Sequence, residues 1–186
     1  MSAELQAVGG GPDKEKFCSV QEFVPNSIEL LDYLSALQSR SAEEDLTAHQ
    51  QGDILSRCIN PGDFENCFLY ACVVGETDGN CGNYRLQPDG VNERGETTYR
   101  MIKVDNALTF SENNSEFDIF LNEFPQAMQG ISQQGRDFLH SLTDEKIAAM
   151  EEKMVFFGLG KSAVKAFRTR IRILRECATI PEITLK

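Results

Sequence analysis

Three side chains with oxygen ligands, Asp78, Asn83 and Asp105, stand where they can do chemistry together. Asp78 and Asn83 are five residues apart in a loop rich in Gly and Asn, and Asp105 directly follows Met101-Ile102-Lys103-Val104, a mostly apolar stretch. A carboxylate and an amide on one loop, facing a second carboxylate at a hairpin tip, suit a Mg²⁺–phosphate site, since Mg²⁺ binds one or two protein oxygens together with waters and substrate phosphates. The remaining carboxylate can accept a proton from an attacking hydroxyl.

A buried helix and a hairpin are expected to position these side chains. Asn60-Pro61 is typical of a helix start, with Asn as the N-cap and Pro at the first helical position. The following residues, 64–74, are apolar nearly all round, which predicts a helix buried on most sides and ending at Gly75. Beyond the loop, residues 84–86 and 98–104 read as strands joined by a Gly-rich turn.

The flanking segments follow the same rules of periodicity and capping. Residues 17–24 alternate well enough for a strand that Pro25 stops, and Asn26 is expected to start a helix, with Glu29 completing a capping box. The polar residues 38–57 read as a loop with one helical turn. After Ser111 the chain is expected to be helical, with one helix capped by Thr143 and another over residues 161–177.

Composition restricts the class of protein. The chain has 186 residues, with 29 acids against 18 bases and a formal net charge of −11. This length fits one domain or one lobe of a larger fold. The acidic balance argues against nucleic-acid binding, because neutralising phosphates needs clustered Lys and Arg. With no apolar run of about 18 residues and no signal-like start, we expect a cytoplasmic protein without a transmembrane segment.

The six cysteines do not form a metal-binding pattern. No CxxC is present and no cysteine pair has zinc-ribbon spacing, so we expect free thiols. Cys58, Cys67, Cys72 and Cys177 have apolar neighbours and are expected to be buried. Cys81 lies in the Gly/Asn-rich loop and is expected to be exposed.

The stretch FLYACVVGETDGNCGNYRL (68–86), followed by MIKVDNALTF (101–110), resembles the catalytic and metal-binding loops of the phosphoinositide 3/4-kinase-like superfamily, which includes actin-fragmin-kinase-like and bacterial effector kinases. The pattern of that family is roughly Gly-x-x-Asp-x-x-x-x-Asn, then an apolar strand ending in Asp, then a small residue and an aromatic. Upstream, SVQEFVPNSIELLDYL (19–34) is similar to the hinge strand and first helix of the C-terminal lobe of this family. The resemblance covers about residues 17–177.

The resemblance implies an α+β, mainly α-helical fold. Residues 17–180 would form a kinase-like C-terminal lobe with a small β-hairpin that carries the catalytic and metal loops. A flexible arm at 1–16 and a tail at 181–186 would flank it.

The family pattern also assigns roles to residues of the loops. Asp78 would be the catalytic residue, and Asn83 and Asp105 would bind Mg²⁺ or Mn²⁺. ATP would be the phosphoryl donor, and the acceptor would be a hydroxyl of an unknown protein or lipid. The residues expected to support the loop are Gly75, Asn80 and Gly82.

Two departures from the family keep two functions open. The family usually has His two residues after the catalytic Asp, where this chain has Asn80. An ATP site of this type also needs an N-terminal lobe with a phosphate-covering loop and a Lys, and only about 20 residues precede the hinge. That lobe would come from a longer chain or a partner. We therefore expect either an incomplete phosphotransferase lobe or a catalytically inactive interaction module (a pseudokinase), acting in the cytoplasm or, if the chain is a secreted effector, in the cytosol of a host.

The segment 161–177 carries six bases on an otherwise acidic chain. Lys165, Arg168 and Arg172 are candidates for contact with an anionic lipid head group or a phosphorylated partner. The alternative, which the frequency of solvated charge runs favours, is a face that only meets water.

Simpler interpretations of the loop also remain. Asp, Asn and Gly dominate turns for conformational reasons, so residues 78–83 can be a turn and nothing more. The chain can also be a helical domain unrelated to kinases, in which Asp78, Asn83 and Asp105 lie far apart. An EF-hand does not fit, since the loop has Asn83 where that motif needs Gly. No Gly-x-Ser-x-Gly motif supports a hydrolase.

Overall fold

The computed structural model describes residues 4–9, 15–20, 23–40, 46–104, 110–112 and 124–176. Over these residues the fold is α+β and mainly helical, as the sequence predicts. The α-helices are α1 (Leu30–Arg40), α2 (Ala48–Cys58), α3 (Pro61–Val74), α4 (Gln133–Ser141), α5 (Asp144–Phe156) and α6 (Lys161–Glu176). The strands are β1 (Glu4–Gly9), β2 (Glu15–Val20), β3 (Ile28–Glu29), β4 (Tyr84–Val91) and β5 (Thr97–Lys103), and the short 3₁₀ helices are η1 (Cys81–Asn83) and η3 (Pro125–Met128).

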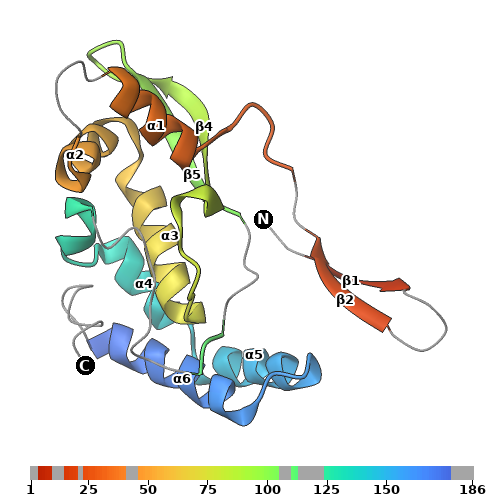
Figure 1. Ribbon diagram of the computed structural model, residues 1–186. Coiled ribbons are helices and arrows are strands. Elements are labelled where there is room, and N and C mark those ends of the chain that lie inside the picture. Colours follow the sequence, from red (N-terminus) through yellow and green to blue (C-terminus); the bar gives the residue numbers. More distant parts are fainter. Residues whose placement is uncertain are drawn as a thin grey trace.

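The strands form two antiparallel sheets. β1 pairs with β2, while β3, β4 and β5 form the second sheet in that order. In the second sheet Tyr84 lies opposite Lys103, and Ile28 lies opposite Leu86. Helix α3 runs through the middle of the molecule, with β5 packed along it from Asn60 to Cys67 and α6 across its carboxyl end (Figure 1). The loop that follows α3 is therefore placed between the main sheet and the last helix.

Helix α3 is the centre of the hydrophobic core. Asn60 caps it, since its side-chain oxygen accepts from the Gly62 N–H at 2.9 Å, and Pro61 occupies the first helical position. Most of its body is buried, including Phe68, whose side chain is fully enclosed. The helix ends at Gly75, which adopts a left-handed backbone with φ of +65°. These features confirm the predicted bounds and the predicted burial of this helix.

Helix α6 packs a buried arginine against the end of α3. Arg170 is 1% exposed, and its guanidinium donates to the carbonyl oxygens of Val73 (3.1 Å), Val74 (3.2 Å) and Ser111 (2.8 Å). The last carbonyls of a helix lack partners within it and carry partial negative charge, so a cation there both satisfies and stabilises them. Burial lowers the pKa of Arg170 to about 10, so the group stays charged at neutral pH.

The segment 38–57, expected to be mostly loop, instead contains the 11-residue helix α2. Thr47 and Gln50 form a capping box at its start, with the Thr47 N–H donating to the Gln50 side chain at 2.8 Å. Its apolar residues are few, and Leu55 is the one that is fully buried. The apolar residues lie on one face, but polar residues and Gly52 outnumber them, so the segment as a whole resembles a polar loop, which is why the prediction was wrong.

The expected helix start at Asn26 is also wrong, since α1 begins at Leu30. Asn26 instead has a φ of +53° in a turn, and the next residues pair with β4 as the short strand β3. Glu29, expected in a capping box, accepts from the Arg85 guanidinium at 3.1 Å. Ile28 and Glu29 are extended because they pair with β4, so the helix can begin only after them.

The N-terminal segments differ in part from the prediction. The expected arm at 1–16 contains β1 and the first residues of β2, and the strand expected over 17–24 ends at Val20. The tail at 181–186 and Cys177 lie outside the described residues. Among the helices that are described, none is long and apolar enough to cross a membrane.

Candidate functional site

The loop after α3 is held in one conformation by its own side chains. The Asn83 amide donates to the backbone oxygen of Asp78 at 2.6 Å, which closes the five-residue separation between them. The Asn80 amide donates to the Asp78 carboxylate at 2.7 Å, while its own oxygen accepts from the Gly82 N–H at 2.9 Å. Asp78 and Asn83 are half-buried and Asn80 is exposed. The fold therefore brings the candidates Asp78 and Asn83 together, and Asn80 is hydrogen-bonded to the Asp78 carboxylate.

Asp105 lies outside the described residues, but the described residues before and after 105–109 are hydrogen-bonded to residues that border this loop or belong to it. Before it, the Val104 N–H donates to the backbone oxygen of Asn83 at 2.8 Å. After it, the Phe110 N–H donates to the Val74 oxygen at 2.6 Å and the Ser111 N–H to the Gly75 oxygen at 3.1 Å. Phe110 has a φ of +63°, a strained backbone for an aromatic residue.

A buried ion pair joins the loop to strand β5, and sequence reasoning missed it. The ammonium of Lys103 lies 2.6 Å from the Glu76 carboxylate, with side-chain exposures of 6% and 2%. The same ammonium donates to the Val104 carbonyl at 3.3 Å and lies 5.0 Å from the centre of the Tyr84 ring. Strand alternation places Lys103 on the face of β5 that carries buried Met101, but nothing in the local sequence identifies Glu76 as its partner.

The surroundings of the loop are apolar enough to shift the pKa of several neighbours. Burial raises the pKa of the Cys67 and Cys72 thiols to about 12, so both stay protonated. Burial and the nearby Glu76 charge raise the pKa of the Tyr84 hydroxyl above its ordinary value. The predictions of free thiols and of burial are confirmed for Cys58, Cys67 and Cys72, while Cys81, expected to be exposed, is half-buried.

The glycines named as loop support have different surroundings. Gly75 lies against the Arg170 guanidinium, so that a Cβ there would be 2.5 Å from the guanidinium carbon. At Gly82 a Cβ would lie 3.0 Å from the Asn80 side-chain oxygen. Gly75 is therefore tightly enclosed. At Gly82 the absence of a side chain lets the Asn80 oxygen approach closely and accept a hydrogen bond from the Gly82 N–H.

The candidate anion-contact residues on α6 are separate from this loop. Lys165 and Arg172 are exposed. Arg168 is engaged by Glu151 of α5, with its two nitrogens 2.7 and 2.5 Å from the carboxylate oxygens. That bond raises the pKa of Arg168. Two other bases of this helix, Arg170 and Arg175, donate to backbone carbonyls. The basic face is thus smaller than its sequence suggests.

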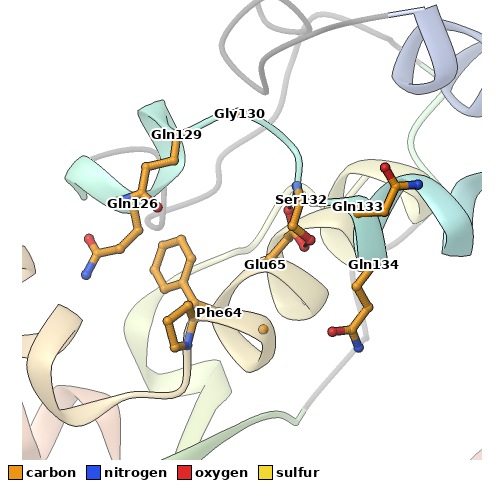
Figure 2. Close-up of a pocket in the computed structure, with 10 residues that line it drawn as sticks. Phe64, Glu65, Gln126, Gln129, Gly130, Ser132, Gln133 and Gln134 are labelled. Carbon is orange, nitrogen blue, oxygen red and sulfur yellow. Dashed lines mark hydrogen bonds between the residues drawn. The ribbon is translucent and has the colours of Figure 1, made fainter.

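The described residues also line a cavity at the opposite end of α3, of about 390 Å³. Figure 2 shows Phe64, Gln126, Gln129 and Gln134 around it, with Glu65 directed at Ser132. The Glu65 carboxylate accepts from the Ser132 N–H at 2.6 Å and from its hydroxyl, so this acid already occupies the start of α4. Since α3 has 14 residues, its two ends are about 20 Å apart. This cavity is not part of the candidate site.

A more apolar cavity, of about 420 Å³, lies beside the loop between α3, α4, α5 and α6. Val74 and Phe110 line it on the side of the loop, and Lys153 is its charged member. Nothing in the described residues shows what covers it.

The chemistry of the donors suits a hard divalent cation. Carboxylate and amide oxygens such as those of Asp78 and Asn83 are the ligands that Mg²⁺ and Mn²⁺ take in proteins. Within the described residues, no group of three or more His, Cys, Asp or Glu side chains could hold a metal by itself. A metal here would therefore need substrate phosphates and water, together with Asp105.

Comparison with known proteins leaves the family undecided. No protein-family model matches the chain, and the search of curated proteins finds no relative.

Proposed function

We propose that the chain is the C-terminal lobe of a kinase-like phosphotransferase, in which the loop 75–83 and the segment that begins at Asp105 form the phosphate and metal half of the active site. The observation that carries this proposal is the hydrogen bond from the Val104 N–H to the Asn83 backbone oxygen, which holds the chain just after β5 against the loop. Asp105 is the next residue in the sequence, and consecutive Cα atoms are only about 3.8 Å apart.

Each of these residues has a role in the proposed transfer. Asn83 and Asp105 would bind Mg²⁺ between the phosphates of ATP, which neutralises charge that builds up on the transferred group. Asp78, held half-buried by Asn80 and Asn83, would orient the acceptor hydroxyl and take its proton. Because transfer of this kind depends on positioning and electrostatics, loss of either metal ligand should abolish it.

The lobe would need a second lobe to enclose the nucleotide. The β1–β2 hairpin precedes α1 and pairs only with itself among the described strands. A two-stranded hairpin is marginally stable alone, which supports the idea that further strands from a longer chain or a partner complete it. We therefore expect this chain to bind Mg–ATP weakly and to turn over little or no substrate by itself.

The test is isothermal titration calorimetry of ATP binding with and without Mg²⁺. The chain should bind ATP only when Mg²⁺ is present, and Asp105→Ala and Asn83→Ala should abolish the binding. Asp89→Ala is the matched control, since Asp89 is an exposed acid on the same hairpin. Binding that is absent in every protein, or that survives both substitutions, would refute the proposal.

The hydrogen bond from Asn80 to Asp78 favours a second candidate, an inactive kinase-like interaction module. It engages the carboxylate that would receive the proton, at the position where the family usually has His. Asn80→His separates the two candidates in an assay with a supplied N-terminal lobe. An increase in phosphoryl transfer is expected for a weakened kinase, and no change for a module that only binds.

A further inference from the structure

The buried pair Glu76–Lys103 connects the two halves of the candidate site. Glu76 lies two residues before Asp78 on the loop, and Lys103 lies two residues before Asp105 on β5. Their charged atoms are 2.6 Å apart with both side chains almost fully enclosed. A pair this deeply buried is a weak source of stability, because desolvation of both charges offsets their attraction. Stability alone is therefore a weak reason for a charged pair at this point of the fold.

We propose that Glu76 and Lys103 are positioning residues, which set the distance between the Asp78 loop and the end of β5 and so determine the affinity for Mg–ATP. This inference rests on the proposed function. Within the part of the chain that the structure describes, the Lys103 ammonium contacts Glu76, the Val104 carbonyl and the face of the Tyr84 ring. Tyr84 also lies directly opposite Lys103 in the β4–β5 ladder. The ammonium is thus fixed at the point where the loop and both strands meet.

The consequence is a site whose two backbone segments move together. The Val104 N–H bond to Asn83 lies one residue beyond Lys103, and the loop that contains Glu76 begins where Arg170 holds the end of α3. If the ion pair is lost, the end of β5 keeps the Asn83 bond but loses its attachment at Glu76. We expect that bond to open more often and the metal ligands to be held less accurately.

The test compares the protein with the double variant Glu76→Gln/Lys103→Met, which removes both charges of the pair together. Lys103→Met alone removes the ammonium and keeps the Glu76 carboxylate. The matched control is Arg100→Met on the same strand, which removes an exposed contact of 3.5 Å with Asp63. Urea unfolding, calorimetry with Mg–ATP and amide hydrogen exchange are measured on each protein.

Amide exchange supplies a readout without ligand. In the double variant the Val104 amide should exchange at least tenfold faster, while the Asn60 amide, bonded to Tyr99 near the other end of β5, should not change. Calorimetry should show Mg–ATP affinity at least tenfold weaker in the double variant and unchanged in Arg100→Met. A purely structural pair would instead change stability and leave both readouts as in the unaltered protein.

Each outcome decides between the hypotheses. Unchanged Val104 exchange, or unchanged Mg–ATP affinity in the double variant, overturns the positioning role. If the unaltered protein binds no Mg–ATP, the proposed function fails, while faster Val104 exchange would still show that the pair sets the loop. Should the double variant not fold, Lys103→Arg keeps the charge but changes its reach and geometry. It is then expected to weaken Mg–ATP binding several-fold, and an unchanged affinity would refute the proposal.

Discussion

Replacing Gly75 by Ala should destabilise this protein far more than a glycine substitution normally does. Gly75 ends α3 with a φ of +65°, and the Arg170 guanidinium lies directly against it. A Cβ built at this position would be 2.5 Å from the guanidinium carbon and 2.6 and 2.8 Å from its two terminal nitrogens. These distances are too short for contact, so either Arg170 or the backbone has to move.

The magnitude follows from two contributions. A left-handed backbone costs an L-residue about 1–2 kcal/mol. Displacing Arg170 breaks one or two of its hydrogen bonds to Val73, Val74 and Ser111, and bonds from a charged donor are worth about 1.5–3 kcal/mol each. Gly75→Ala should therefore lower the free energy of unfolding by about 2.5–8 kcal/mol. That is a large part of the 5–15 kcal/mol that is usual for a whole domain.

Urea unfolding followed by circular dichroism measures this loss, and the chain offers a matched control. Gly158 has a φ of +83° and no atom within 4 Å of the position of its Cβ, so Gly158→Ala should show only the backbone contribution of about 1–2 kcal/mol. The difference between the two variants isolates the clash with Arg170. In an Arg170→Met background, Gly75→Ala should cost about as much as Gly158→Ala, because the clash has been removed.

Two results would refute this reasoning. One is a loss for Gly75→Ala no larger than that for Gly158→Ala. The other is a loss that stays the same when Arg170 is replaced, since the two substitutions would then be additive and the contact would carry no energy.

Three further predictions concern residues around the core and the loop. The half-buried Cys81 thiol should react with a thiol reagent at pH 8 much faster than Cys67, whose pKa burial raises to about 12, so Cys81→Ser should remove one fast-reacting thiol. Thr143→Ala should destabilise α5 by about 1 kcal/mol, because it removes the N-cap that accepts from the Lys146 N–H. The same substitution should raise the pKa of Glu145, which the Thr143 hydrogen bond lowers, and NMR titration of Glu145 measures that change. A carboxylate whose pKa is lowered by folding stabilises the fold at pH values above its unfolded pKa, and this stabilisation is lost as the pH falls through the folded pKa. The free energy of unfolding of the variant should therefore fall less on acidification. Tyr84→Phe should raise the free energy of unfolding by about 1 kcal/mol, because the buried hydroxyl has no hydrogen-bond partner among the described residues, and a loss of stability in urea would show that it has one.

Local sequence was enough to predict the helices whose ends are marked by capping residues. Asn60-Pro61 and Gly75 bound α3, and Thr143 caps α5, as expected. Such signals act through hydrogen bonds within a few residues, so they can be read without knowledge of the fold. The short apolar stripe of α2 and the turn at Asn26 were misjudged, since packing and sheet pairing with distant residues decide both.

The candidate loop was also visible in the sequence, through the spacing of Asp78 and Asn83. That spacing alone could not separate a turn from a site, because Asp, Asn and Gly favour both. The attachment of Val104 to Asn83 joins residues about 20 positions apart, and it depends on the pairing of β4 with β5. This contact gives the proposed site its support.

The sequence by itself determined the composition, most of the helices, and the residue types that could bind a metal and phosphates. Only the tertiary structure decided which charged residues are enclosed. Arg170 is one of six bases in its segment, yet it alone lies buried under the end of α3, in contact with a carbonyl 97 residues away. In the sequence Lys103 is one residue of an ordinary strand pattern. In the folded protein the loop places Glu76 beside it. Burial of a charge depends on a partner supplied from elsewhere in the chain, and local periodicity contains no information about that partner.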